Sequence, residues 1–325
     1  MAESTRRAFL KTAAVTGMLA SGVGASSAAA RADEGGRLVV PRRRLGKIGA
    51  EVSMLGLGLG SAFTSPFERD REAGQALLVK ALDHGINYFD TARGYGPSEE
   101  MIAPVVRAHR ERIYLVSKSG ARDYDGFMRE FDRSVRNLGV DRIDLFHLHN
   151  LKPGQDDLDR MERGCLRAVR QLKEQGVIDA FGVTGHSGAQ ILTDAVARFD
   201  PDAILTIFPV TRPDAGRYES ETLKLAREKR MGVIAMKIFR RAREADLKPA
   251  DMIGYAWSLP GVHCAIIGLD QLVHLEQNAE IAANFEPLDE ARRDELHRVA
   301  SARLGDYPAP YELPGYEDAH RSVTV

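Results

Sequence analysis

The feature that most limits how this chain can fold is a regular alternation of short apolar runs with longer amphipathic segments. The apolar runs predict β-strands at residues 53–58, 87–89, 113–118, 144–149, 180–184, 203–208, 233–237 and 264–268. The amphipathic segments predict helices at residues 70–84, 98–109, 125–138, 157–175, 187–199, 216–230, 248–259 and 271–283. Eight strands alternating with eight helices over roughly 250 residues are typical of an α/β fold, the (β/α)8 TIM barrel.

An open, doubly wound parallel sheet is the alternative fold. Its dinucleotide-binding fingerprint, G-x-G-x-x-G at the start of a helix, is not found after a strand, because Gly56, Gly58 and Gly60 have a different spacing. Before the barrel, segments 38–40 and 51–53 flank a glycine-containing turn and predict a short N-terminal β-hairpin. We expect helices to end at five glycines: Gly85, Gly139, Gly176, Gly232 and Gly261.

The amino-terminal segment differs in composition from the rest of the chain. Arg6 and Arg7 precede an apolar pair, residues 13–30 are uncharged and rich in small residues, and residues 30–32 form an A-x-A cleavage site. This segment resembles a bacterial twin-arginine signal peptide, and a disordered basic tail is the alternative. The resemblance implies export of the folded protein by the twin-arginine machinery to the periplasm. We therefore predict a signal peptide over residues 1–32 and a barrel over 33–325, with a C-terminal tail from about residue 286.

Composition excludes several other classes of protein. The chain is 44% hydrophobic and 28% charged with a net charge of -1, so nothing favours a nucleic-acid partner or an acidic membrane surface. The small residues of segment 13–30 make a poor membrane-spanning helix, and we expect no stable membrane insertion. Cys165 and Cys264 lack metal-ligand spacing and are expected to be buried thiols, and no metal site is predicted.

Polar side chains lie at several predicted strand ends. Asp90 directly follows the second strand, Lys118 ends the third and His149 ends the fourth. Tyr95 lies between two glycines in the loop after the second strand, which predicts a turn that presents its phenol. Because the strand carboxyl ends hold the chemistry of TIM barrels, we expect these four residues to meet in one catalytic cleft. His147 lies on the same strand face as His149 and is expected to be a barrel-interior histidine with satisfied hydrogen bonds, not the histidine that contacts substrate.

The four side chains suit the reduction of a carbonyl group. A phenol has an unperturbed pKa near 10, and a neighbouring ammonium such as that of Lys118 lowers this pKa. Asp90 can pair with the ammonium, and His149 can donate a hydrogen bond to a carbonyl oxygen. Tyr95 would then give a proton to the developing alkoxide. The set contains no activated nucleophile, so we expect the hydride to come from a nicotinamide cofactor.

The motifs around these residues resemble those of the aldo-keto reductase family. The similarity is carried by segments 89–92, 95–99, 117–118, 144–149, 182–185 and 268–278, and it extends over residues 40–285. It implies reduction of an aldehyde or ketone, or the reverse oxidation, with NADPH or NADH and a small-molecule carbonyl substrate. The implied catalytic tetrad is Asp90, Tyr95, Lys118 and His149. The implied cofactor-binding residues are Gly58, Leu59, Asp90, Thr184, Gly185, Met236, Lys237, Gly268, Asp270, His274 and Asn278.

Two cofactor positions depart from the family pattern around the nicotinamide. Thr184 and Gly185 stand where the family usually has Ser-Asn, and we expect His186 or Thr206 to compensate for the missing side chain. Met236 stands where an aromatic residue commonly stacks on the nicotinamide, and its thioether can still pack against a ring.

A third departure concerns the adenosine 2'-phosphate, which the family usually meets with a cation. Here that closing loop carries Asp270, with His274 as the nearby candidate cation. Asp270 either faces the phosphate, which would favour NADH, or points to solvent, or caps a helix beginning at Gln271. The substrate pocket is expected from loops near 212–218 and 240–245 and from the tail at 304–320, whose residues do not name a substrate.

Two other functions compete with the oxidoreductase. A catalytically idle, nucleotide-binding barrel could act as a sensor or partner subunit, although it would not need all four tetrad groups. A barrel hydrolase using His149 and Asp90 would lack a nucleophile and a metal cluster. Absorbance with and without added NADPH, followed by a carbonyl panel, separates these functions.

Overall fold

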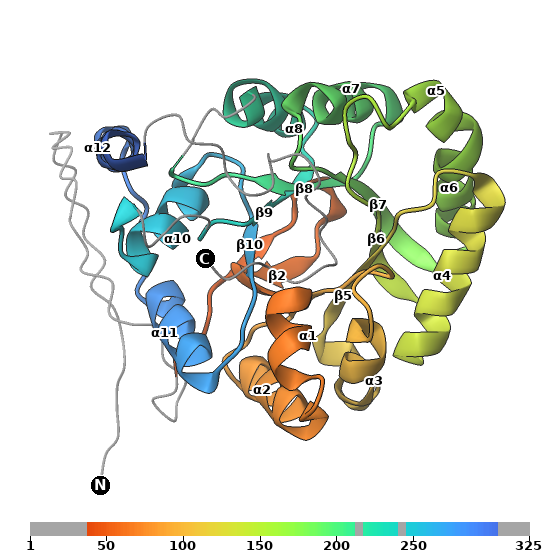
Figure 1. The fold of residues 1–325 in the computed structure, drawn as a ribbon, viewed down its shortest axis with the longest axis horizontal. Coiled ribbons are helices and arrows are strands. Elements are labelled where there is room, and N and C mark those ends of the chain that lie inside the picture. The colour runs from red at the N-terminus through yellow and green to blue at the C-terminus, as the bar shows by residue number, and fades with distance from the viewer. Residues whose placement is uncertain (1–37, 212–216, 240–244, 305–325) are drawn as a thin grey trace, which may run out of the picture.

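The computed structural model describes residues 38–211, 217–239 and 245–304. The signal peptide predicted over residues 1–32 and most of the residues predicted to form the substrate loops and tail lie outside these ranges. Eight parallel strands form a closed barrel in the order β10-β3-β4-β5-β6-β7-β8-β9, which confirms the predicted TIM barrel (Figure 1). The strands are β3 (Leu55–Gly58), β4 (Tyr88–Asp90), β5 (Tyr114–Ser119), β6 (Ile143–Leu148), β7 (Ile178–Thr184), β8 (Ala203–Ile207), β9 (Gly232–Met236) and β10 (Cys264–Ile267).

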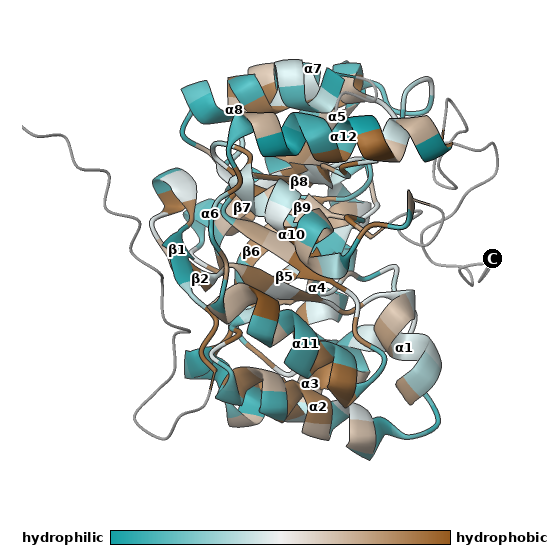
Figure 2. Cartoon of the chain, turned by 90° about the vertical axis from the view of Figure 1, so that its left-hand side faces the viewer, coloured by the Kyte–Doolittle hydropathy of each residue, from teal (hydrophilic) through white to brown (hydrophobic). Residues whose placement is uncertain are grey.

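Helices surround the barrel, and their apolar sides pack onto the buried strands (Figures 1 and 2). The α-helices are α1 (Ser61–Phe67), α2 (Arg71–Asp83), α3 (Ser98–Ala108), α4 (Tyr124–Leu138), α5 (Leu158–Met161), α6 (Arg167–Glu174), α7 (Ala189–Phe199), α8 (Lys224–Glu228), α10 (Pro249–Ser258), α11 (Leu272–Ala283) and α12 (Glu290–Leu304). A π-helical turn, Glu162–Leu166, joins α5 to α6, and a second, Tyr218–Leu223, precedes α8. Helices α1 and α12 were not predicted.

The N-terminal hairpin exists, but its first strand was predicted in the wrong place. Strand β1 (Arg42–Arg44) pairs antiparallel with β2 (Glu51–Ser53), whereas the prediction placed the first strand at residues 38–40. A strand of three arginines carries no apolar signal. The central one is nevertheless a structural residue, because the Arg43 guanidinium donates to the carbonyl oxygens of Trp257 and Val262 at 3.1 and 2.6 Å.

The predicted helix ends hold at four of the five glycines. Gly139 shows why, because it ends α4 with a φ of 66°, a backbone conformation that side-chain-bearing residues avoid. Gly85, Gly176 and Gly261 likewise follow helices with positive φ. Gly232 was wrong as a helix end: it is the first residue of β9, where an added Cβ would lie 2.8 Å from the Leu45 side chain.

Three further observations concern the described residues. Cys165 and Cys264 are both buried and free, as expected. Among the residues that the structure describes, no helix is both long and apolar enough to cross a membrane. The same residues contain no cluster of three His, Cys, Asp or Glu side chains able to hold a metal ion.

Candidate active site

A buried ion pair lies at the carboxyl ends of two neighbouring strands. Asp90 is the last residue of β4 and Lys118 the last but one of β5. The Lys118 ammonium donates to Asp90 Oδ1 at 2.6 Å and to the carbonyl oxygen of Thr91 at 2.7 Å. The two side chains are 0% and 1% exposed, so water screens this pair very little. The pairing fixes the ammonium at the end of the barrel where TIM-barrel chemistry takes place.

Burial and charge act on Asp90 in opposite directions. Loss of solvation raises the pKa of this carboxyl above its ordinary value, and the charge and hydrogen bond of Lys118 lower it. The second carboxylate oxygen, Oδ2, is buried and has no hydrogen-bond partner within the described part of the chain. The carboxylate is therefore held by its ammonium partner and offers one unused acceptor.

Tyr95 and His149 lie beside this ion pair. The Lys118 ammonium lies 4.7 Å from the centroid of the Tyr95 ring, which places a positive charge over the phenol. The imidazole of His149 meets the Tyr95 ring edge to face, with 5.6 Å between the ring centroids. The structure thus brings together all four residues of the predicted tetrad, with an ammonium and an imidazole both next to one phenol.

The loop that carries Tyr95 is held by main-chain and side-chain contacts. Arg93 donates its amide to the Lys118 carbonyl at 3.0 Å, and Tyr95 donates to Ala92 at 3.0 Å. Sequence reasoning missed a further support, the fully buried Glu99 in the first turn of α3. Its carboxylate accepts hydrogen bonds from the side chains of Ser117, Arg93 and Asn137 at 2.8, 2.9 and 3.1 Å. An acidic residue at a helix start carries no sequence signal for such burial.

A cavity of about 340 Å³ opens beside the phenol of Tyr95. It is lined by Gly58, Gly60, Ser61, Ala62, Asp90, Tyr95, Met236, Lys237, Ile238, Phe239, Ile266, Ile267 and Gly268. Five of the predicted cofactor-binding residues are among them: Gly58, Asp90, Met236, Lys237 and Gly268. Leu59 is not among these lining residues; it is buried, and its carbonyl oxygen accepts a hydrogen bond from Ser98 at 2.6 Å.

The lining of this cavity suits a flat aromatic ring. Glycines at the ends of β3 and β10 expose backbone in place of side chains, and at Gly60 an added Cβ would already lie 3.5 Å from the Tyr95 ring. At Gly268 an added Cβ would lie only 2.4 Å from the Cβ of Ala62. The Met236 side chain adds a polarisable apolar surface. With the unused Asp90 oxygen nearby, these residues fit a planar group that carries polar atoms, such as a nicotinamide.

The predicted carboxamide-binding residues lie elsewhere in this structure. The Thr184 hydroxyl oxygen accepts the amide of Asn150 at 2.7 Å, and the buried Thr206 hydroxyl donates to the carbonyl oxygen of Gly185 at 2.7 Å. Thr184, Gly185 and the buried His186 do not line the cavity. The two hydroxyls stabilise the loops after β6 and β7, and Thr206 is not among the residues that line this cavity.

The remaining predicted residues lie around the start of α11. Asp270 accepts a hydrogen bond from Nδ1 of His274 at 2.6 Å, and both side chains are nearly half exposed. The helix begins at Leu272 after Gln271 without a side-chain cap, so of the alternatives for Asp270 the capping role is wrong. Asn278 is buried on α11. These three residues also do not line the cavity.

His147 is fully buried inside the barrel, as expected, but neither of its ring nitrogens has a hydrogen-bond partner among the described residues, so the expectation that they are satisfied is wrong. Burial lowers the pKa of its imidazole well below the ordinary value, and the positive charges of Lys118 and His149 lower it further. His147 is thus neutral, and its ring packs so closely on β7 that a Cβ at Gly182 would lie 2.3 Å from its Nδ1.

Comparison with known proteins agrees with this geometry. The family model for the aldo/keto reductase family matches residues 54–251. Pyridoxal 4-dehydrogenase of Microbacterium luteolum is 30% identical over 254 residues, covering 61% of this chain and 70% of the relative. D-threo-aldose 1-dehydrogenase of a Pseudomonas species is 29% identical, with coverages of 62% and 70%.

Solved structures share the fold. An aldo-keto reductase structure from Pseudomonas aeruginosa superposes with a TM-score of 0.64 at 29% identity, covering 74% of this chain and 94% of the other. One from Bacillus halodurans gives 0.68 at 21% identity, with coverages of 81% and 97%, and shows the fold alone. Family match, barrel and relatives together show that this chain belongs to the aldo/keto reductase family and is an NAD(P)H-dependent carbonyl oxidoreductase.

Proposed function

We propose that Tyr95 is the general acid of this oxidoreductase and protonates the alkoxide formed when a carbonyl group is reduced. The observation that carries the proposal is the position of the Tyr95 ring, with the Lys118 ammonium 4.7 Å from its centroid and the His149 ring edge to face with it. A positive charge so close stabilises a phenolate, so it eases proton release from the Tyr95 hydroxyl. The same hydroxyl accepts the proton back when the alcohol is oxidised.

Asp90 and His149 have different supporting roles. Asp90 holds the Lys118 ammonium at 2.6 Å, which keeps the charge beside the phenol. The His149 imidazole lies next to the Tyr95 ring, from where it would donate a hydrogen bond to the substrate oxygen. The carbonyl oxygen would therefore be oriented by two donors, Tyr95 and His149, before it gains charge.

The cavity beside Tyr95 is the proposed nicotinamide site. Gly58, Gly268 and Met236 would hold the flat ring, and Lys237 lies at the same edge of the cavity. When bound, the reduced nicotinamide supplies the hydride that the protein side chains cannot. The family resemblance alone supports five further candidates for contacts with the remainder of the dinucleotide: Thr184, Gly185, Asp270, His274 and Asn278.

The test of this function is turnover measured through the cofactor. Purified protein is mixed with NADPH or NADH and a panel of carbonyl compounds, and the near-ultraviolet absorbance of the reduced nicotinamide is followed. Pyridoxal and aldoses belong in the panel, with NAD(P)⁺ for the oxidative direction, because relatives carry the names pyridoxal 4-dehydrogenase, D-threo-aldose 1-dehydrogenase and L-galactose dehydrogenase. Nucleotide binding without turnover of any carbonyl or aldose would instead support an idle, sensor-like barrel.

We also propose that the protein is exported folded to the periplasm. Support comes from the sequence of residues 1–32, where Arg6 and Arg7 precede an uncharged segment rich in small residues and an A-x-A site. The twin-arginine machinery would then be its export partner, and the cofactor could bind before export.

A further inference from the structure

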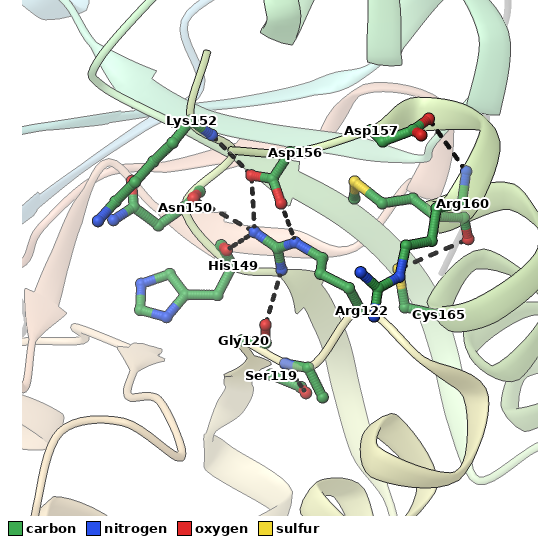
Figure 3. Close-up of polar contacts among 12 residues, drawn as sticks. Ser119, Gly120, Arg122, His149, Asn150, Lys152, Asp156, Asp157, Arg160 and Cys165 are labelled. Atoms are coloured by element: carbon green, nitrogen blue, oxygen red, sulfur yellow. Dashed lines mark hydrogen bonds and ion pairs between the residues drawn. The ribbon is translucent and has the colours of Figure 1, made fainter. Parts of the chain in front are cut away.

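One guanidinium joins the loops that follow β5 and β6. Arg122 lies just before α4, and its side chain crosses to the loop after β6, as Figure 3 shows. Its Nε donates to Asp156 Oδ1 at 2.5 Å and its Nη2 to Asp156 Oδ2 at 3.1 Å, which is a two-point contact with the carboxylate. The same Nη2 donates to the carbonyl oxygen of His149 at 2.8 Å, and Nη1 donates to Gly120 at 3.0 Å.

His149 needs such support because it lies beyond the end of strand β6 at Leu148. Its amide donates to the Ser119 carbonyl at 2.9 Å, and its carbonyl oxygen accepts from Arg122. The next residue, Asn150, has a φ of 55°, an unfavourable value for a residue with a side chain. In Figure 3 the His149 carbonyl faces the Arg122 guanidinium and the imidazole points away from it. The main chain is thus fixed on one side, while the ring reaches Tyr95 on the other.

Arg122 is itself held at its main chain. Its carbonyl oxygen accepts the Cys165 amide at 2.9 Å, and Cys165 belongs to the π-helical turn Glu162–Leu166. A Cβ at Gly164 would lie 2.2 Å from this carbonyl oxygen, so the close approach requires glycine. A π-helical turn inside an α-helix interrupts the regular hydrogen bonding and is frequent at functional sites. Here it presents an amide to the residue that supports His149.

The contact between Arg122 and Asp156 forms a clamp, and its acceptor, the Asp156 carboxylate, is also held in place. Asp156 is 7% exposed at its side chain, and its Oδ2 accepts the Lys152 amide at 2.7 Å in addition to Arg122. On the opposite side, Glu130 of α4 accepts the Gly120 amide at 3.1 Å and so holds the loop from which Arg122 projects. Further hydrogen bonds therefore hold both of the loops that this contact joins.

We propose that Arg122, paired with Asp156, is a positioning residue that sets the place of the His149 imidazole for its hydrogen bond to the substrate oxygen. The proposal rests on the proposed function, in which His149 contacts that oxygen. Lysine cannot replace arginine here. The planar guanidinium donates to both Asp156 carboxylate oxygens and to the carbonyl oxygens of His149 and Gly120, and a single ammonium cannot reach all four. A displacement of a catalytic group by about 1 Å can reduce turnover by about a hundredfold.

The experiment compares Arg122→Lys with Arg198→Lys. Arg198 of α7 makes similarly short ion pairs with Asp159 and Glu162, at 2.5 and 2.9 Å. These ion pairs are largely exposed to solvent and include no residue of the tetrad. We expect Arg122→Lys to lower kcat by about ten- to a hundredfold while the Kd for the nicotinamide cofactor changes less than about twofold. Arg198→Lys should leave both constants unchanged. An unaltered kcat in Arg122→Lys overturns the proposal.

A double-mutant cycle with His149→Ala separates positioning from a general loss of structure. If Arg122 acts through His149, then Arg122→Lys costs little further kcat once the imidazole is gone, whereas independent effects would multiply. Multiplying effects therefore overturn the proposal. Asp156→Asn provides a second route if Arg122→Lys folds poorly, and it should show the same dependence on His149. Full turnover in His149→Ala alone would contradict the proposed function rather than the clamp.

Discussion

Replacing Lys118 by methionine should destabilise the protein in a way that depends on pH. The substitution keeps most of the side-chain volume but removes the ammonium that pairs with Asp90 at 2.6 Å. Asp90 is 1% exposed and could not exchange this partner for water. Loss of one partner from a buried ion pair typically lowers the free energy of unfolding by about 3–5 kcal/mol. For a barrel of this size the corresponding fall in Tm is roughly 10 °C.

The sign of the pH dependence follows from the pKa of Asp90. Burial already raises this pKa above 3.8, and Lys118 is the group that lowers it. Without Lys118 the pKa of the folded state rises further, so the folded variant binds a proton more tightly than the unfolded chain does. The loss in free energy of unfolding relative to wild type should therefore be small near pH 4. It should grow as the pH rises toward the new pKa of Asp90 in the folded variant.

The assay is urea unfolding at pH 5 and pH 8, followed by the fluorescence of Trp257, which is the single tryptophan and is buried. Lys173→Met is the matched control, because Lys173 pairs with Asp202 at the same 2.6 Å but is 39% exposed at its side chain. We expect the control to lose less than about 1 kcal/mol. Adding Asp90→Asn to Lys118→Met should restore part of the stability at pH 8. Equal losses at both pH values, or no recovery in the double variant, would refute the reasoning.

Two further predictions concern the cofactor and export. Asp270→Arg should raise the affinity for NADPH relative to NADH by roughly tenfold, since it replaces a half-exposed, screened carboxylate in the closing loop by a cation. Calorimetric titration with both nucleotides measures the two affinities. An unchanged ratio of these affinities would show that Asp270 does not sense the 2'-phosphate. Replacing Arg6 and Arg7 together by lysine should leave the protein in the cytoplasm with residues 1–32 still attached. Cell fractionation checks this. Normal delivery of the variant to the periplasm would speak against the twin-arginine pathway.

Sequence patterns predicted the barrel because its strands are buried on both faces. Residues 143–148 and 203–207, for example, are buried throughout and are mostly apolar, interrupted by Asp144, His147 and Thr206, so they stand out from the amphipathic segments around them. The meeting of Asp90, Lys118 and His149 was also predictable, since each lies at or just after such a run, and Tyr95 follows in the loop after β4. The parallel register then necessarily brings neighbouring strand ends together.

Other features could not be predicted because their charged residues suggest solvent exposure, whereas in the folded protein contacts with distant residues bury or pair them. Helix α12 is rich in charge and buries only Leu296, Ala300 and Leu304 along one side. The clamp by Arg122 and the burial of Glu99 depend on partners distant in sequence, such as Asp156 and Asn137. A charged residue in a loop or a first helical turn looks solvent-exposed until the partner that neutralises it is placed.

The substitution Tyr95→Phe tests the central claim most directly, because it removes the proton donor and keeps the ring beside Lys118 and His149. The measurement is turnover of a carbonyl substrate together with the Kd of the reduced nicotinamide, both on the same protein preparation. The account predicts an unchanged Kd and a fall in turnover of roughly a hundredfold or more, the scale of a lost general acid. Turnover at the wild-type rate in Tyr95→Phe would contradict it.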